Sequence, residues 1–169
     1  MIRMHRIAHS QLDKEKRLAT LGAGLLVREA NQILYKEGLT FLTVGSIDEI
    51  SVGSVFANSV HNSAINAGSL ADSLVACKVV TADGKLRTLR KDAQDSEERE
   101  LFAATGCGCG TTGVIVEVTY EVEPAFGLAP TFEKVCIREA LKKGNGPGGL
   151  ADLAKKSEFV KVSKVDDLL

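Results

Sequence analysis

The chain has 169 residues, of which 44% are hydrophobic and 25% are charged, a composition typical of a globular protein and unlike that of a disordered one. Its 21 Lys and Arg residues are matched by 22 Asp and Glu residues, so the net charge is −1. This balance lacks the basic excess typical of a nucleic-acid binder. There is no run of about 18 apolar residues, so we expect no transmembrane helix.

The first ten residues, MIRMHRIAHS, admit two interpretations. Two arginines without an acidic residue are compatible with the end of a mitochondrial targeting segment. Alternatively, the alternation of residues 3–9 predicts a strand, and the early acids Asp13 and Glu15 favour this second interpretation. We therefore predict a hairpin in which strands 3–9 and 17–22 are joined by the polar turn LDKEK.

A helix is predicted over residues 25–36, and Gly38 supplies its C-terminal stop. One face of this helix carries Leu26, Ala30, Ile33 and Leu34. Residues 41–44 should be extended, and Ser51 is a candidate cap for a short helix over 52–58.

The next segments predict a second hairpin and a helix. The β-branched run 74–81 is followed by Asp83-Gly84, a tight turn signal, and by a returning strand at 85–89. Acidic residues precede ELFAAT, which predicts a helix at 95–104 because carboxylates stabilise a helix N-terminus.

Residues 114–122, VIVEVTYEV, alternate strictly and give the clearest strand signal. One alternating set of side chains faces the core. It is either the set Val114, Val116, Val118, Tyr120 and Val122 or the residues that alternate with them. Further along, we expect a helix at 131–143, a loop at 144–149 and a last strand at 157–163. The fold class is therefore α+β: a largely antiparallel sheet containing 74–81, 85–89 and 113–123, flanked by helices at 25–36 and 95–104.

The four cysteines do not match a zinc site. Cys107 and Cys109 form a C-x-C pair, but a second pair with zinc-ligand spacing is missing. Cys77 lies in an apolar strand pattern and should be a buried hydrophobic residue. We expect all four, including Cys136, to be reduced thiols in a reducing compartment, and we expect no metal.

The stretch between Lys36 and Lys78 contains no Lys or Arg and is rich in small residues. Two interpretations remain open. Backbone N–H groups in such a segment can hold an anionic ligand without any cation. Alternatively, the small residues only relieve crowding in a tightly packed connection.

Three segments stand in an order that is specific. They read DKEKRLATLGAGLLVREANQILYKEGL, then GSIDEISVGSVFANSVHNSAINAGSLADSLVACKVVTADGKLRTL, then ELFAATGCGCGTTGVIVEVTYEVEPAF. Together they resemble the FAD-binding domain of the aldonolactone oxidases and dehydrogenases, which include gulono-, galactono- and arabinono-lactone oxidases of the vanillyl-alcohol-oxidase superfamily. The resemblance covers roughly residues 5 to 128 and is weaker beyond them.

The resemblance implies the second lobe of a vanillyl-alcohol-oxidase-type FAD domain. Members of the family pass a hydride from a sugar lactone to the flavin N5, and oxygen or cytochrome c then reoxidises the flavin. By resemblance, residues 45–64 face the flavin and its pyrophosphate, and 113–116 line the flavin or adenine. The implied cofactor-binding residues are Gly45, Ser46, Ile47, Gly53, Asn58, Ser59, His61, Asn62, Ser63, Gly113, Val114 and Ile115. We assign no catalytic or metal-binding residue.

The flavin-facing loop departs from the family pattern, GG-x-I-x-T-G-T-H-G-S-G. Gly53, His61 and Ser63 are kept. Glycines of the pattern are replaced by Ser54, Ser59, Asn62 and Ala64. A glycine used for close approach cannot gain a side chain without strain or displacement of the ligand. We therefore expect FAD to be bound weakly or to be lost.

The role of His61 stays open, because it can be a general base, a flavin contact or a structural residue. We slightly favour the structural role, since the glycines that would bring a flavin close are replaced.

The expected organisation is a partial FAD-binding domain at 1–128 and a C-terminal extension at 129–169, where a cap domain would start. The family's glycine-rich pyrophosphate loop and its substrate cap have no counterpart here. We therefore expect the chain to correspond to about one lobe, truncated at both ends.

Three functions follow from this organisation. The first is a pseudoenzyme: an accessory or structural subunit of a larger mitochondrial assembly, whose other subunits cover the exposed face of the lobe. The second is a fragment of an active FAD-dependent sugar-lactone oxidoreductase that acts on a CH–OH donor. The third is a free-standing nucleotide-binding module, disfavoured because such pockets form between lobes. The chain alone is expected to lack activity, and its location to be mitochondrial or otherwise intracellular.

Overall fold

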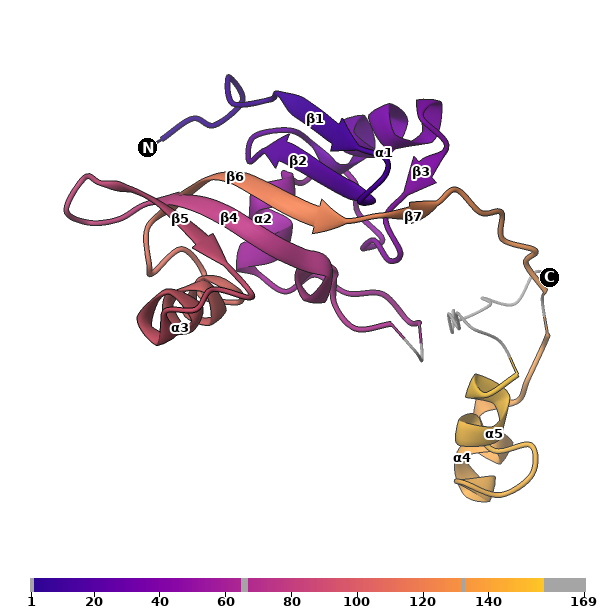
Figure 1. Cartoon of the computed structure of the whole chain (residues 1–169). Coiled ribbons are helices and arrows are strands. Elements are labelled where there is room, and N and C mark those ends of the chain that lie inside the picture. Colours follow the sequence, from indigo (N-terminus) through magenta and orange to yellow (C-terminus); the bar gives the residue numbers. More distant parts are fainter. Residues whose placement is uncertain (1, 65–66, 132, 157–169) are drawn as a thin grey trace.

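The computed structural model describes residues 2–64, 67–131 and 133–156. Its centre is a five-stranded sheet with the order β1-β2-β6-β4-β5, in which each neighbouring pair is antiparallel (Figure 1). The strands are β1 (Ser10–Asp13), β2 (Leu18–Gly22), β4 (Leu74–Val80), β5 (Leu86–Arg90) and β6 (Val114–Glu121). A separate two-stranded ladder joins β3 (Leu39–Thr40) to β7 (Glu123–Pro124).

Helices α1 (Val27–Lys36), α2 (Val52–Ala57) and α3 (Ser96–Thr105), with the 3₁₀ turn η1 (Leu70–Ser73), complete this body. The sheet therefore brings 74–80, 86–90 and 114–121 together, as the sequence predicts, and helices stand at both predicted positions. Ser51 caps α2, because its Oγ accepts a hydrogen bond from the amide of Ser54 at 3.3 Å. Gly38 ends α1 with a φ of +72°, a left-handed conformation that glycine adopts without steric cost.

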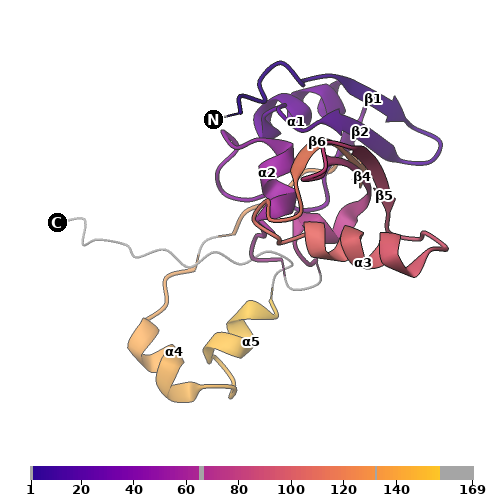
Figure 2. The same cartoon turned by 90° about the vertical axis from the view of Figure 1, so that its left-hand side faces the viewer.

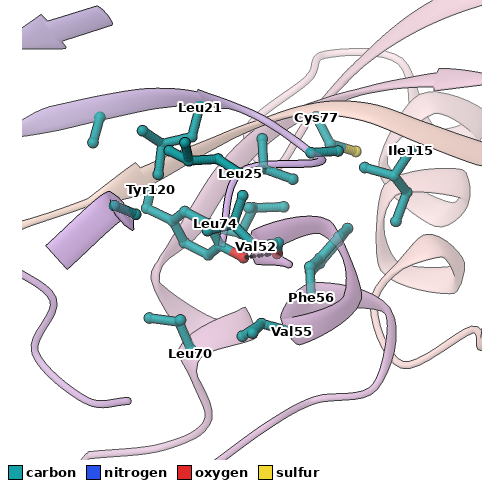
Figure 3. Close-up of a cluster of buried hydrophobic side chains, with 14 of the residues drawn as sticks. Leu21, Leu25, Val52, Val55, Phe56, Leu70, Leu74, Cys77, Ile115 and Tyr120 are labelled. Atoms are coloured by element: carbon teal, nitrogen blue, oxygen red, sulfur yellow. Dashed lines mark hydrogen bonds between the residues drawn. The ribbon is translucent and has the colours of Figure 1, made fainter. Parts of the chain in front are cut away.

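One face of the sheet is buried under α2 and η1 (Figure 3). Tyr120 is fully buried there, and its hydroxyl donates a hydrogen bond to the Val52 carbonyl at 3.0 Å. Phe41 meets the Tyr120 ring edge-on, with ring centroids 5.5 Å apart. Phe56 of α2 lies 5.9 Å from Phe102 of α3, so the two helices share the same core. Cys77 is 2% exposed and belongs to this core, as the sequence predicts.

The opposite face of the sheet carries polar side chains. Glu117 on β6 lies 2.8 Å from both His9 Nε2 and Lys78 Nζ. Partial burial works against ionisation of Glu117, but the hydrogen bonds from Lys78 and His9 outweigh it and lower the pKa of this carboxyl. These two ion pairs link β6 to Lys78 of β4 and to His9, just before β1.

Neither alternation predicted for residues 114–122 is correct along its whole length. Ile115 is buried at the start of β6, whereas Val118, Tyr120 and Val122 are buried further on, so the inward set changes phase. The change coincides with a register shift, in which Lys78 pairs with Glu117 but Val79 pairs with Ile115. An extra residue on one strand reverses the faces that follow it.

Three boundaries also differ from the prediction. The first strand begins at Ser10 rather than at residue 3, because the Ile7 amide turns back to the Met4 carbonyl at 2.8 Å and interrupts a ladder there. The strand nearest the expected extended piece at 41–44 is β3, where residues 39–40 pair with β7. The predicted helix at 131–143 is confined to α4 (Ile137–Lys143), since Val135 and the residues before it include poor helix formers.

The C-terminal part forms a small helical hairpin set apart from the sheet (Figure 2). Helix α4 packs against α5 (Leu150–Ala154), and the predicted loop at 144–149 joins them. Gly144 and Gly148 take positive φ values of 53° and 74° in this loop. The strand predicted at 157–163 lies outside the described residues. Within the described ranges, no helix has the length and apolar character needed to cross a membrane.

Candidate functional site

The start of α2 lies at the centre of the predicted cofactor segment, but its amides are already used. The Val52 amide donates to the Leu25 carbonyl at 2.9 Å, and the Gly53 amide donates to the Ala23 carbonyl at 3.1 Å. The Ser54 and Val55 amides both donate to Ser51, one to its hydroxyl and one to its carbonyl. Because these donors are satisfied within the chain, they are not available to a phosphate group.

The glycines in this region serve internal packing. A Cβ at Gly53 would lie 2.8 Å from the Cβ of Ala23, so this glycine lets α2 rest on the chain that follows β2. A Cβ at Gly45 would lie 2.5 Å from Cγ1 of Val60, which brings loop 45–47 against the segment after α2. The two neighbours of Gly45 in the predicted site, Ser46 and Ile47, are exposed, and Ile47 retains 65% of its accessible surface.

The chain turns sharply after α2. Asn58 donates from Nδ2 to the Ser54 carbonyl at 2.9 Å, which closes the helix. Ser59 then takes a φ of +48°, inside the left-handed region that favours glycine. This is one of the positions at which the family pattern has glycine, so the backbone keeps the glycine conformation with a serine in it.

Residues His61, Asn62 and Ser63 form an exposed loop. The Nδ1 atom of His61 lies 3.2 Å from the Asn62 carbonyl oxygen, and the Ser63 amide donates to the Asn62 side-chain oxygen at 2.8 Å. The amides of His61 and Asn62 find no acceptor among the residues that the structure describes. This loop therefore carries an exposed imidazole beside two amides that have no acceptor among the described residues.

Loop 106–113 is hydrogen-bonded to the C-terminal end of α2. The Cys107 amide donates to the Phe56 carbonyl at 3.2 Å, and the Cys109 amide donates to the Ala57 carbonyl at 3.0 Å. Both cysteines have left-handed φ values, 59° and 50°. The Cys109 sulfur also lies 3.9 Å from the Asn58 side-chain oxygen. The structure thus joins the glycine-rich loop to the turn at Asn58 and Ser59, a contact that the sequence did not predict.

Gly113, Val114 and Ile115 begin β6. A Cβ on Gly113 would lie 2.3 Å from the Val80 carbonyl oxygen, and its φ is +146°. Val114 pairs with Val80, and Ile115 pairs with Val79 and is buried among the core side chains. The Ile115 side chain therefore serves the core, and any ligand contact in this segment falls to exposed backbone or to Val114.

The predicted contacts thus divide into two groups. Gly45 and the turn at Asn58–Ser63 come together around Val60, whereas Gly53 and Ile115 are buried in the body of the lobe. Their role as cofactor contacts stays a prediction. Sequence reasoning did not single out Thr43 and Thr112, whose hydroxyl oxygens are buried without a hydrogen-bond partner in the described part of the chain. Each lies within two residues of a predicted contact, Gly45 or Gly113, but nothing in a threonine's sequence context signals an unpaired hydroxyl.

The conformation of Ser59 gives a testable stability effect. We expect Ser59→Gly to raise the free energy of unfolding by about 0.5–1 kcal/mol, because relief of roughly 1–2 kcal/mol of left-handed strain exceeds the entropy that glycine adds to the unfolded chain. Urea denaturation measures the change. Ser59→Ala is the matched control, since alanine keeps the strain. Equal stability of the glycine and alanine variants would contradict this expectation.

The chain matches the model of one protein family, described as the FAD binding domain, over residues 1–90, which is just over half of its length. It is 32% identical over 159 residues to an L-gulonolactone oxidase of Mus musculus, covering 94% of this chain and 33% of the relative. It is 29% identical over 143 residues to a D-arabinono-1,4-lactone oxidase of Saccharomyces cerevisiae, covering 85% of this chain and 25% of the relative. The chain therefore spans a third or less of these relatives.

Among solved structures, an alkyldihydroxyacetonephosphate synthase aligns with a TM-score of 0.62 and 22% identity. The alignment covers 73% of this chain and 22% of that protein. At this identity the likeness concerns the fold, and it agrees with the antiparallel lobe described above. The chain therefore belongs to the family of FAD-binding domains, whose cofactor is FAD, and it is similar to a third or less of each aldonolactone oxidase.

Proposed function

We propose that this chain is a degenerate FAD-binding lobe that serves as an accessory or structural subunit of a larger mitochondrial assembly. In this role the lobe presents a scaffold to a partner and does not hold FAD tightly by itself. The observation that carries the proposal is the internal use of the α2 amides together with the serine at the left-handed position 59.

The residues fit one end of FAD better than the other. The amides of His61 and Asn62, which have no acceptor among the described residues, lie in an exposed loop and suit hydrogen bonds to the polar edge of a flavin ring. The first turn of α2 does not suit the pyrophosphate, since its donors are satisfied and no Lys or Arg lies between Lys36 and Lys78. When bound, FAD would supply hydride acceptance at the flavin N5. This chain would position and tune the ring through the loop at 61–63.

The same proposal divides the chain at about residue 128. The five-stranded sheet ends with β6 and the small ladder with β7, and α4 and α5 form their own hairpin beyond them (Figure 1). Residues 1–128 are then the lobe, and 129–169 are the start of a cap-like extension. Exposed apolar side chains, including Phe126 and Leu128, are a reason to expect partner subunits on this side.

A titration of the chain with FAD tests the proposal. We expect weak or undetectable binding, followed by flavin fluorescence, because the pyrophosphate lacks donors. Riboflavin serves as a matched ligand that has the ring but no phosphate; similar weak binding of both would place the contact at the ring. Stoichiometric binding of FAD below micromolar concentration, about −8 kcal/mol or better, would overturn the proposal.

The variant His61→Ala tests whether the loop at 61–63 contacts the flavin ring. If the ring is held at 61–63, the substitution should lower flavin occupancy or shift the flavin absorbance bands, with the melting temperature nearly unchanged because His61 is exposed. The titration is done with the complementary lobe or partner present. Earlier unfolding with an unaltered flavin spectrum would instead make His61 a scaffold residue.

A second candidate is a piece of an active FAD-dependent oxidoreductase that acts on a sugar lactone. The retention of His61 and Ser63, and the names of the relatives, favour it. Purification of the native protein separates the two candidates: co-purifying flavin with lactone-dependent dye reduction supports the enzyme, and a colourless complex with another polypeptide supports the accessory role.

A further inference from the structure

The pair Cys107 and Cys109 is not used by the proposed function, yet it lies on a rigid part of the molecule. Both thiols are free and exposed. Their backbone amides are fixed by hydrogen bonds to the carbonyls of Phe56 and Ala57. Between them, a Cβ on Gly108 would lie 2.3 Å from the Ala104 carbonyl oxygen, so the loop also rests on α3. The loop therefore fixes the backbone that carries two exposed thiols two residues apart.

The side chain of Cys109 lies next to the backbone of Cys107. The Cys109 sulfur lies 3.9 Å from the carbonyl oxygen of Cys107. A carbonyl oxygen is about 3 Å from the Cβ of its own residue, so the Cys109 sulfur lies on the Cys107 side of the turn. Cα atoms two residues apart in a turn are about 5–7 Å from each other, which overlaps the range in which disulfides form.

We propose that Cys107 and Cys109 form a dithiol modification site that hydrogen peroxide converts to an intraloop disulfide. In the first step the thiolate of one cysteine attacks the peroxide O–O bond, giving a sulfenic acid and releasing water after protonation. In the second step the other thiol displaces the sulfenic oxygen, forming the S–S bond and a second water. The balance is two thiols and one peroxide giving one disulfide and two waters. Thiol reductants reverse the reaction by exchange.

The other two cysteines provide internal controls. Cys77 is buried, and burial raises the pKa of its thiol to about 12, so little reactive thiolate is present near neutral pH. Cys136 is exposed and precedes α4, outside the 106–113 loop. It should be oxidised singly or in mixed disulfides, without the paired product.

Trypsin separates the three sites, because cleavage after Arg99 and Lys134 releases Cys107 and Cys109 on one peptide without any other cysteine. The whole chain is treated with equimolar peroxide, alkylated and digested, and the masses of the peptides are measured by mass spectrometry. We expect the 100–134 peptide to lose two hydrogens, to resist alkylation and to recover on reduction, while Cys77 stays alkylatable only after unfolding. The paired product should be the main product of this peptide, whereas the Cys136 peptide should carry a sulfenic or sulfinic acid or a mixed disulfide.

Cys107→Ser is the matched variant, since serine replaces one sulfur with oxygen. It should give a sulfenic or sulfinic product at Cys109 in place of the disulfide. The proposal would be overturned if both cysteines of the treated chain were alkylated as fast as in the untreated chain. It would also be overturned if each cysteine were oxidised on its own at the rate of Cys136. Disulfides to a second chain, detected as a dimer on a non-reducing gel, would also overturn it.

Discussion

Replacing Gly113 with alanine is expected to lower the free energy of unfolding by about 2–5 kcal/mol, from left-handed strain of roughly 1–2 kcal/mol plus overpacking of roughly 1–3 kcal/mol. The added Cβ would lie 2.3 Å from the Val80 carbonyl oxygen and 2.9 Å from a Val79 methyl group. Both neighbours belong to β4, the central partner of β6, so neither can move without disturbing the ladder. For a domain of marginal stability this is a large fraction of the total.

Gly84→Ala is the control for this prediction. Gly84 also has a positive φ, +75°, but a Cβ added there would have no neighbour within 4 Å. It should cost only the strain, about 1–2 kcal/mol. Urea denaturation of the two variants gives the difference. Equal losses would mean that β6 can shift away from β4, and the steric explanation for Gly113 would then be wrong.

Tyr120→Phe is expected to lower the free energy of unfolding by about 0.5–1.5 kcal/mol, because it removes the hydrogen bond from the phenol to the Val52 carbonyl inside the core. The hydroxyl links β6 to the first residue of α2, so the substitution weakens the contact between this helix and the sheet (Figure 3). Tyr35→Phe is the matched control: Tyr35 is 75% exposed, and its change should be close to neutral. A neutral Tyr120→Phe would show that water or another donor replaces the phenol.

The pH dependence gives Tyr120 a second readout. Burial, with a smaller contribution from the nearby Cys77, raises the pKa of the phenol above its ordinary value of about 10. A raised pKa in the folded state means that this stability is fully present below about pH 10 and is lost above it. The wild-type chain should therefore lose stability more steeply than the phenylalanine variant in alkaline solution.

Much of the sheet could be predicted because local signals agreed with the tertiary structure. Asp83-Gly84 specified a hairpin, and the β-branched residues around Cys77 specified a strand that the core confirms. The bulge opposite Val79 could not be predicted, because it depends on a partner strand and alternation within β6 carries no trace of it. The segment 3–9 alternates like a strand. However, the carbonyls of Ile7 and His9 accept hydrogen bonds from the amides of Gly24 and Gly22, and the segment does not form a regular strand.

The candidate site was less accessible to sequence reasoning. Small residues in 45–64 are compatible with a phosphate loop and with close packing, and only coordinates distinguish the two. At Gly53 the structure favours packing, since the space is filled by Ala23. The left-handed turn at Ser59 agrees with the glycine of the family pattern at that position. The hydrogen bonds from Cys107 and Cys109 to the end of α2 join residues some fifty positions apart. A local sequence pattern cannot predict such a contact.

The placement of β6 between β2 and β4 has a consequence for how the chain folds. The hairpins β1–β2 and β4–β5 join neighbouring segments, but β2 meets β6 through pairs such as Leu21 with Val118. Long loops must close before such pairs form, which slows folding. During synthesis both hairpins keep an open edge until residue 121 has left the ribosome. The nascent chain therefore depends on β6 to join the two hairpins into a single sheet, and it is most prone to aggregate just before β6 emerges.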